Sequence, residues 1–139
     1  MTGWEYFNAV RDAVKECNEA YFVRMYGRPH QTGLGRSSDV SDPTSQRYTE
    51  LAEADAVIDA CSPIIQEAEC VIAGLRKIMT SNAKIADVLE LRYLELMQPR
   101  EIAERLGISK VWERKLHQIG LQMFDNLGKA FLYEKGLKD

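Results

Sequence analysis

Apolar residues recur every three or four positions along most of this 139-residue chain, and this spacing constrains the fold more than any other feature. Since an α-helix has about 3.6 residues per turn, residues spaced in this way share one face and can be buried together. No stretch alternates between apolar and polar residues as a half-buried strand does. The sequence therefore predicts an all-α protein.

The first predicted helix is amphipathic and covers residues 1–26. Its apolar stripe consists of Trp4, Phe7, Val10, Val14, Cys17, Tyr21 and Met25. We expect the helix to end at Gly27, because glycine favours a left-handed cap and the following Pro29 cannot continue the hydrogen-bond ladder. Residues 27–43 have no apolar period and include three glycines, which predicts a flexible linker.

A long helical segment is expected over residues 44–79. Asp42 and Pro43 make a good start, since aspartate can accept an unpaired backbone N–H and proline at the first position wastes no donor. Ser62 and Pro63 interrupt the pattern, and they either cap a new helix or kink a continuous one.

The second part of this segment keeps the spacing of helices that pack lengthwise. Its apolar positions are Ile64, Ala68, Val71, Leu75 and Ile78. The packing partner is either the first helix or a second copy of the chain, and the second alternative would make a homodimer through amphipathic helices.

Residues 80–139 contain a pattern of helices and turns that points to a specific kind of function. A short helix over residues 85–94 precedes Pro99, which opens the next helix, and Gly107 and Ser109 supply a turn and a cap. The helix that follows has an expected apolar side of Trp112, Leu116, Ile119 and Met123, and its extension carries Phe124, Leu127, Phe131, Leu132 and Leu137. Two helices joined by such a short corner predict a helix-turn-helix, whose second helix enters the major groove of DNA.

This segment also resembles a known family. Residues 88–95, VLELRYLE, and residues 101–109, EIAERLGIS, are similar to region 4 of sigma-70-type factors, and the likeness covers about residues 85–133. Residues 38–44, SDVSDPT, resemble the connector of small phage regulators with a sigma-like C-terminal domain, the ArpU-like and RinA-like late-gene regulators. The resemblance implies a sigma-like helix-turn-helix domain, a role in transcription, double-stranded DNA as a partner and RNA polymerase as a further one. It places Trp112 where the family has a buried valine.

The candidate DNA-contacting residues lie at the start of the second helix of this unit. Arginine and lysine pair with guanine or phosphate, glutamine with adenine, and glutamate with cytosine. The candidates are Ser109, Lys110, Glu113, Arg114, Lys115, His117 and Gln118. The charge is polarised in the same sense, since residues 99–139 hold 8 Lys and Arg against 6 Asp and Glu, whereas residues 1–98 hold 10 against 15.

Other classes of function are not indicated. The sequence has no glycine-rich phosphate loop, no Cys and His cluster at metal-ligand spacing and no nucleophile with a base, so no enzyme activity, cofactor or metal is expected. Cys17, Cys61 and Cys70 lie in apolar segments, which favours reduced, buried thiols.

The expected location is the cytoplasm, away from membranes, since no apolar run approaches the roughly 20 residues of a membrane span and no signal peptide is recognisable. An alternative function remains open. The long helices would then form a protein-interaction module that binds RNA polymerase or a phage packaging component without reading DNA.

Overall fold

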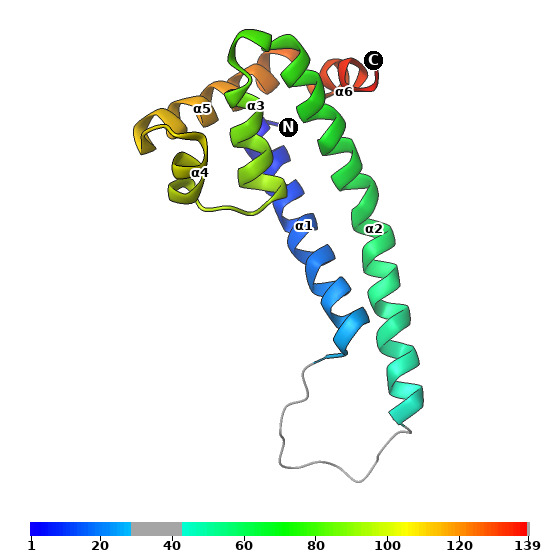
Figure 1. The fold of residues 1–139 in the computed structure, drawn as a ribbon. Coiled ribbons are helices and arrows are strands. Elements are labelled where there is room, and N and C mark those ends of the chain that lie inside the picture. The colour runs from blue at the N-terminus through cyan, green and yellow to red at the C-terminus, as the bar shows by residue number, and fades with distance from the viewer. Residues whose placement is uncertain (29–42, 139) are drawn as a thin grey trace.

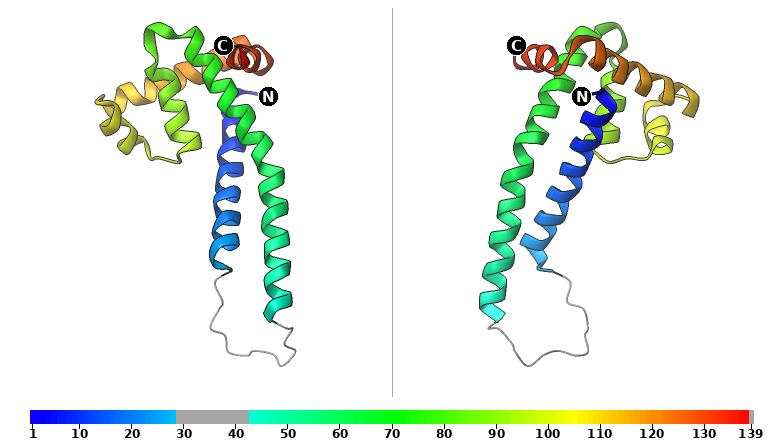
Figure 2. Two further views of the ribbon diagram at one scale, coloured as in Figure 1. Left: turned by 45° about the vertical axis from the view of Figure 1, so that its right-hand side comes forward. Right: turned by 180° about the vertical axis from the view of Figure 1, so that it is seen from behind.

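The computed structural model describes residues 1–28 and 43–138, and these residues form six α-helices and no strand. The prediction of an all-α protein is thus confirmed. Two long helices, α1 (Gly3–Tyr26) and α2 (Pro43–Ile78), lie side by side in opposite directions and project from a group of shorter helices (Figures 1 and 2). This group, here called the head, contains the candidate interface.

Helix α1 begins and ends at recognisable caps. The Thr2 hydroxyl accepts the N–H of Glu5 at 3.1 Å, and the Glu5 carboxylate accepts the N–H of Thr2 in return. The helix ends at Gly27, whose φ of 79° suits glycine. Gly27 is thus the end that the sequence predicts.

The buried face of α1 differs in part from the predicted stripe. Phe7, Val10, Val14 and Cys17 are buried as expected, together with Gly3, Tyr6, Ala13 and Ala20. Trp4, Tyr21 and Met25 are instead 62%, 45% and 67% exposed, so their placement on the packed face was wrong. The small side chains of Ala13 and Ala20 take that place because they let α1 approach α2 closely.

Helix α2 runs without a break through Pro63, which decides between the two alternatives for this position. Its packed face contacts α1 along the hairpin and α6 (Lys129–Leu137) near its C-terminal end. Within this chain, the apolar face of the second part of α2 therefore packs against α1 and α6. Asp42 and most of the predicted linker lie outside the described residues.

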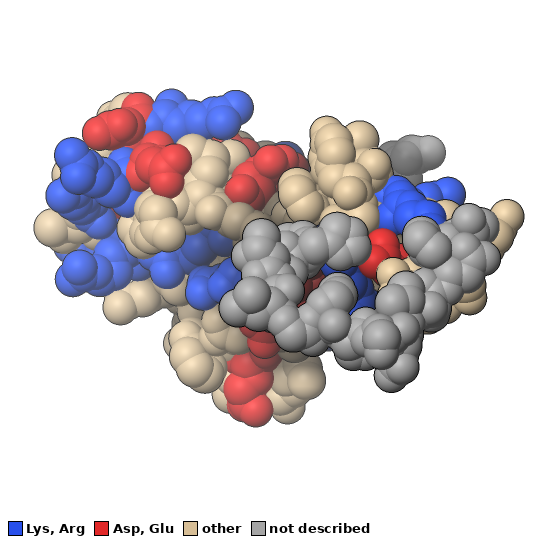
Figure 3. Space-filling model, turned by 90° about the horizontal axis from the view of Figure 1, so that it is seen from below, with Lys and Arg blue, Asp and Glu red and all other residues tan. Residues whose placement is uncertain are grey.

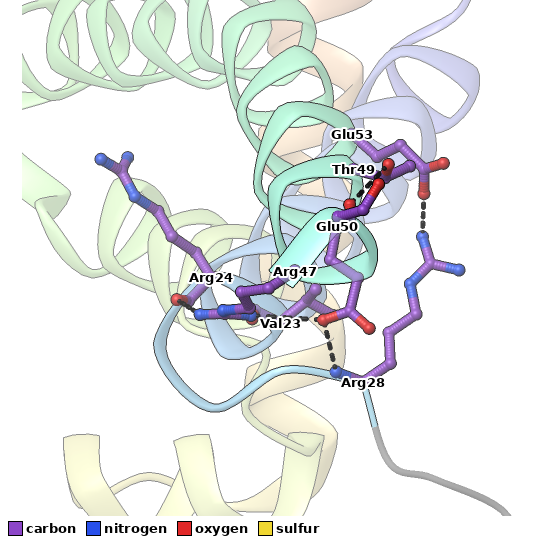
Figure 4. A network of polar contacts seen from close by, with 8 residues as sticks. Val23, Arg24, Arg28, Arg47, Thr49, Glu50 and Glu53 are labelled. Atoms are coloured by element: carbon purple, nitrogen blue, oxygen red, sulfur yellow. Dashed lines mark hydrogen bonds and ion pairs between the residues drawn. The ribbon is translucent and has the colours of Figure 1, made fainter. Parts of the chain in front are cut away.

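Arg47 joins α1 to α2 at the end of the α1–α2 hairpin that lies far from the head (Figure 4). Its guanidinium donates to the carbonyl oxygens of Val23, at 2.9 Å, and Arg24, in the last turn of α1. Glu50 accepts from Arg47 at 3.3 Å, and Arg28 pairs with Glu53. A cation that satisfies the free carbonyls of a helix C-terminus stabilises that end.

The head begins with a 3-10 turn, Thr80–Asn82, and α3 (Lys84–Leu89), which continues into a π-helical turn, Glu90–Leu94. Helices α4 (Pro99–Leu106) and α5 (Lys110–Leu127) follow, and α6 completes the described chain. The sequence predicts one final helix, and this was wrong. The chain breaks at Gly128, which has a φ of 88°.

Helix α6 crosses α2 at two glycines. A Cβ atom at Gly74 would lie 1.9 Å from the carbonyl oxygen of Leu132, and one at Gly136 would lie 1.8 Å from that of Cys70. The two backbones are thus in direct contact, and Leu132 is fully buried there. Phe131 and Leu137 are on the outer face and are half-exposed.

An aromatic cluster joins α1 to the head. The Phe7 ring stacks on Tyr93 of the π-helical turn, with centroids 5.2 Å apart, and Tyr6 stacks on Phe124 of α5 at 4.9 Å. Aromatic pairs of this kind contribute more than their buried area alone. Helix α5 is therefore positioned by α1 as well as by the other helices of the head.

The three cysteines are free thiols, two of them buried. Burial raises the pKa of both Cys17 and Cys61, which keeps these thiols protonated. In the described ranges, no helix is both long and apolar enough to cross a membrane.

Candidate nucleic-acid interface

Helices α4 and α5 are joined by a tight turn of three residues, Gly107, Ile108 and Ser109. Gly107 adopts a left-handed conformation with φ 67° and ψ 37°, and the N–H of Ile108 donates to the carbonyl of Ala103 at 3.0 Å. The Ser109 hydroxyl then accepts the N–H of Trp112 at 3.0 Å and caps α5. The turn and the cap are at the predicted residues.

Most of the predicted contact residues lie on one exposed side of α5. Lys110, Arg114, Lys115 and Gln118 are exposed, and Ser109 is exposed while its hydroxyl is used in the cap. Figure 3 shows basic side chains gathered at the end of the molecule that α4 and the start of α5 form. The structure thus brings five of the candidates to the start of one helix.

Glu113 and His117 are exceptions, because both are buried. The Glu113 residue is 1% exposed and the His117 residue 9% exposed. Their side chains face the π-helical turn rather than solvent. Their placement among the groove-facing residues is therefore corrected, and their role is to hold α5 in the head.

Glu113 forms a buried ion pair with Arg92. Nη2 of Arg92 lies 2.9 Å from Oε1 and 3.3 Å from Oε2 of the Glu113 carboxylate. The two side chains are only 18% and 1% exposed, so water screens the pair weakly. The pair links the first turn of α5 to the π-helical turn.

His117 forms a second polar link to the same turn. Its Nε2 lies 2.6 Å from the hydroxyl of Tyr93. Burial, and then the positive charges of Arg92 and Arg11, lower the pKa of His117 to about 4. Burial raises the pKa of Tyr93, so at neutral pH the hydrogen bond joins a protonated hydroxyl to a neutral imidazole.

The apolar side predicted for α5 is corrected in part, since Leu116 is buried and Met123 packs against the core as expected, but Trp112 and Ile119 are exposed. The buried residues are Glu113, Leu116, His117, Gly120 and Phe124. Trp112 is 44% exposed and Ile119 39% exposed, because the buried face is turned by about one residue from the predicted stripe. Gly120 belongs to this face since a Cβ atom there would lie 3.0 Å from Cδ1 of Leu89.

Because the buried face of α5 is rotated from its predicted position, its exposed side carries different residues from those expected. The exposed Trp112 and its neighbour Val111 lie among the basic residues of α5, where they offer an apolar surface. Apolar groups of this kind contact the thymine methyl in a groove or stack on unpaired bases. Sequence periodicity missed both residues because tryptophan and valine usually point inward.

Other basic residues lie on α4, on α1 and in the π-helical turn. Arg100 and Arg105 are exposed on α4, and Arg100 approaches Glu104 at 4.0 Å, in an ion pair that water screens. Arg11 and Lys15 of α1 line a small pocket with Arg92. No sequence signal links α1 to the π-helical turn, so this grouping is visible only in the fold.

Among the described residues there is no group of three or more His, Cys, Asp and Glu that could hold a metal ion. The arrangement instead offers positive charge, hydrogen-bond donors and an exposed indole on α5, which two buried polar contacts hold in the head. No family model, curated protein or solved structure matches this chain.

Proposed function

We propose that this chain is a DNA-binding transcription regulator of the phage or prophage type. In this proposal α4 and α5 form a helix-turn-helix of the sigma-70 region 4 kind, and α5 lies in the major groove. The observation that carries the proposal is the combination of a capped three-residue turn with an α5 whose free side presents Lys110, Arg114, Lys115 and Gln118.

The chemistry of this side suits duplex DNA. Arginine can pair with both acceptors of a guanine edge, and glutamine with adenine, while lysine neutralises phosphates. Ser109 and Lys110 lie at the N-terminal end of α5, where the helix dipole also favours an anion. The ion pair of Arg92 with Glu113 supports the proposal because it fixes the orientation of this end.

A DNA-binding measurement tests the proposal. Duplex fragments selected from a random pool are titrated with the purified chain at low and moderate salt, and binding is followed by fluorescence anisotropy. We expect the double variant Arg114→Ala, Lys115→Ala to lose at least tenfold in affinity, as two lost phosphate or base contacts imply. Lys84→Ala is the matched control, since Lys84 is an exposed cation of α3 at a distance in sequence from α5.

Both variants should retain the helical content and melting temperature of the native chain, because the three side chains are exposed. Equal affinity of the double variant and the native chain would refute the proposed role of α5. An absence of any selected fragment at either salt would refute DNA binding itself.

A second candidate function, a protein-interaction module, is favoured by the surface of the hairpin. Its free end carries exposed large apolar side chains: Tyr21, Phe22, Met25, Tyr26 and Tyr48. Grouped apolar side chains of this kind often mark protein contacts. The proposed partners are RNA polymerase, a phage packaging component or a second copy of the chain.

The two candidates are separated by a double test. Light scattering measures whether the chain is a dimer, and a pull-down measures whether it retains RNA polymerase. Replacement of Phe22 and Tyr26 by serine should abolish such an interaction and leave DNA affinity unchanged. Loss of both dimerisation and DNA binding in this variant would show that DNA binding needs the dimer.

A further inference from the structure

A small basic pocket lies between α1 and the start of α4. It has a volume of about 180 Å³ and is lined by Arg11, Lys15, Arg92, Gln98 and Pro99, with two apolar side chains. No acidic residue of the described ranges is among those that line it. The pocket therefore concentrates three positive charges in a small volume.

The cations of this pocket are only partly compensated within the fold. Arg11 and Lys15 are one helical turn apart on α1, where like charges repel each other. Arg92 uses Nη2 to pair with Glu113, but its buried Nε–H has no acceptor in the described part of the chain. Buried donors without a partner are rare and require an explanation.

The positive field in this region also acts on a neighbouring group. After burial, the charges of Arg92 and Arg11 are the causes that lower the pKa of His117. Arg11 lies over the Tyr93 ring, with its Cζ 5.0 Å from the centroid, so its guanidinium is held in place. Arg11 is thus positioned by a contact that involves no carboxylate, whereas Arg92 is positioned by its pair with Glu113.

The size of the pocket restricts what it can hold. Pockets for whole small molecules usually occupy about 300–1,000 Å³, so a volume of about 180 Å³ suits a phosphate group better than a nucleotide. Pro99, the first residue of α4, lies at its edge, and the positive end of the α4 dipole adds to the field there.

We propose that this basic pocket binds a phosphate group, supplied by the DNA backbone when α5 occupies the major groove. This inference rests on the proposed function, and it adds α1 to the DNA-contacting surface. Lys15 and Arg11 would hold the phosphate, and Arg92 would join the pocket to the buried pair that orients α5. A phosphate contact fixes the register of a protein on the duplex without reading sequence.

The first arm of the test uses inorganic phosphate and the full chain. At low ionic strength, the Nε–Hε signals of the arginines are followed by NMR while phosphate is added, with chloride as the reference anion. We expect saturable shifts for Arg11 and Arg92 and none for Arg24 and Arg76, which pair with carboxylates elsewhere. Lys15→Gln should weaken this binding severalfold.

The second arm uses duplex DNA. One phosphate contact fewer should lower the slope of log affinity against log salt concentration by about one. We expect this change for Lys15→Gln and no change for the matched control Lys84→Gln. Both lysines are exposed, so both variants should fold and melt like the native chain.

The outcomes separate this inference from the proposed function. If the chain binds DNA and Lys15→Gln keeps the native salt slope, the pocket assignment is overturned and the proposed function stands. If phosphate shifts the Arg11 and Arg92 signals but no duplex binds, the proposed function fails and the pocket takes a free phosphate group instead. Uniform shifts of all arginines would overturn the pocket as a site.

Discussion

The Arg92 guanidinium and the Glu113 carboxylate form an ion pair at 2.9 Å in which the carboxylate side chain is only 1% exposed. The pair connects the π-helical turn to the first turn of α5, directly behind the exposed side of that helix. Removal of one partner leaves a buried charge without compensation, which is far more costly than loss of a surface pair.

We therefore expect Glu113→Ala to lower the free energy of unfolding by about 3–5 kcal/mol. Glu104→Ala, which removes the screened contact with Arg100, should change it by less than about 1 kcal/mol. Urea unfolding followed by circular dichroism measures both values. The interpretation of the pair would be wrong if the two variants lost the same small amount.

A compensated variant extends this prediction. Replacing both members by apolar residues, Arg92→Met with Glu113→Leu, removes the two charges together, and we expect most of the stability lost in Glu113→Ala to return. A double variant as unstable as Glu113→Ala would show that packing at this site, rather than the unpaired charge, determines the loss.

Acid should destabilise the fold through His117. Its folded-state pKa lies at about 4, below the ordinary value of 6.5, so the unfolded chain binds the proton more readily. Stability from this group is fully present above pH 6.5 and is lost as the pH falls from 6.5 toward 4. We expect a loss on the order of 2 kcal/mol across this window.

The measurement is urea unfolding at several pH values for the native chain and for His117→Gln. The variant cannot take up this proton, so its stability should fall less between pH 6.5 and pH 4. His30→Gln, at the other histidine of the sequence, is the matched control and should keep the native acid dependence. Identical pH profiles for all three proteins would contradict the prediction.

Local signals predicted the turn between α4 and α5 because its determinants are adjacent in the chain. Gly107 takes the left-handed conformation and Ser109 caps α5, and each residue type has a strong preference for that position. The same holds for the end of α1 at Gly27. The course of α2 through Pro63 was open, because proline occurs both at the start of a helix and inside a continuous one, and the local sequence does not choose between them.

The buried face of α5 could not be predicted from hydrophobic spacing. Two of its positions hold the polar residues Glu113 and His117, whose partners Arg92 and Tyr93 lie more than twenty residues away. A third holds Gly120, which carries no hydrophobic signal. A pattern that counts only apolar residues therefore places Trp112 on the buried face instead of its neighbour Glu113. The predicted DNA-facing side of α5 is rotated by the same amount.

The close crossing of α2 and α6 predicts that Gly136→Ala is destabilising. In an open helix this change would stabilise by up to about 1 kcal/mol, because alanine favours helix. Here the new Cβ would lie 1.8 Å from the carbonyl oxygen of Cys70, so the helices must separate. We expect a net loss of about 1–3 kcal/mol, which is typical of overpacking.

Thermal and urea unfolding of Gly136→Ala and Gly74→Ala test this crossing. Glu134→Ala, at an exposed position of α6, is the control and should leave stability within about 0.5 kcal/mol. The sign of the effect is decisive. A gain in stability in both glycine variants would show that α6 is not held against α2 in solution.

Trp112 provides a direct probe of the proposed groove-facing side of α5. The chain has two tryptophans, so Trp4→Phe leaves the half-exposed Trp112 as the single source of indole emission. In the free protein, acrylamide should quench this emission readily. A bound duplex would cover the indole, so we expect quenching to decrease severalfold when a selected DNA fragment is added. If DNA binds with native affinity while Trp112 stays equally open to acrylamide, the contact surface is not this side of α5.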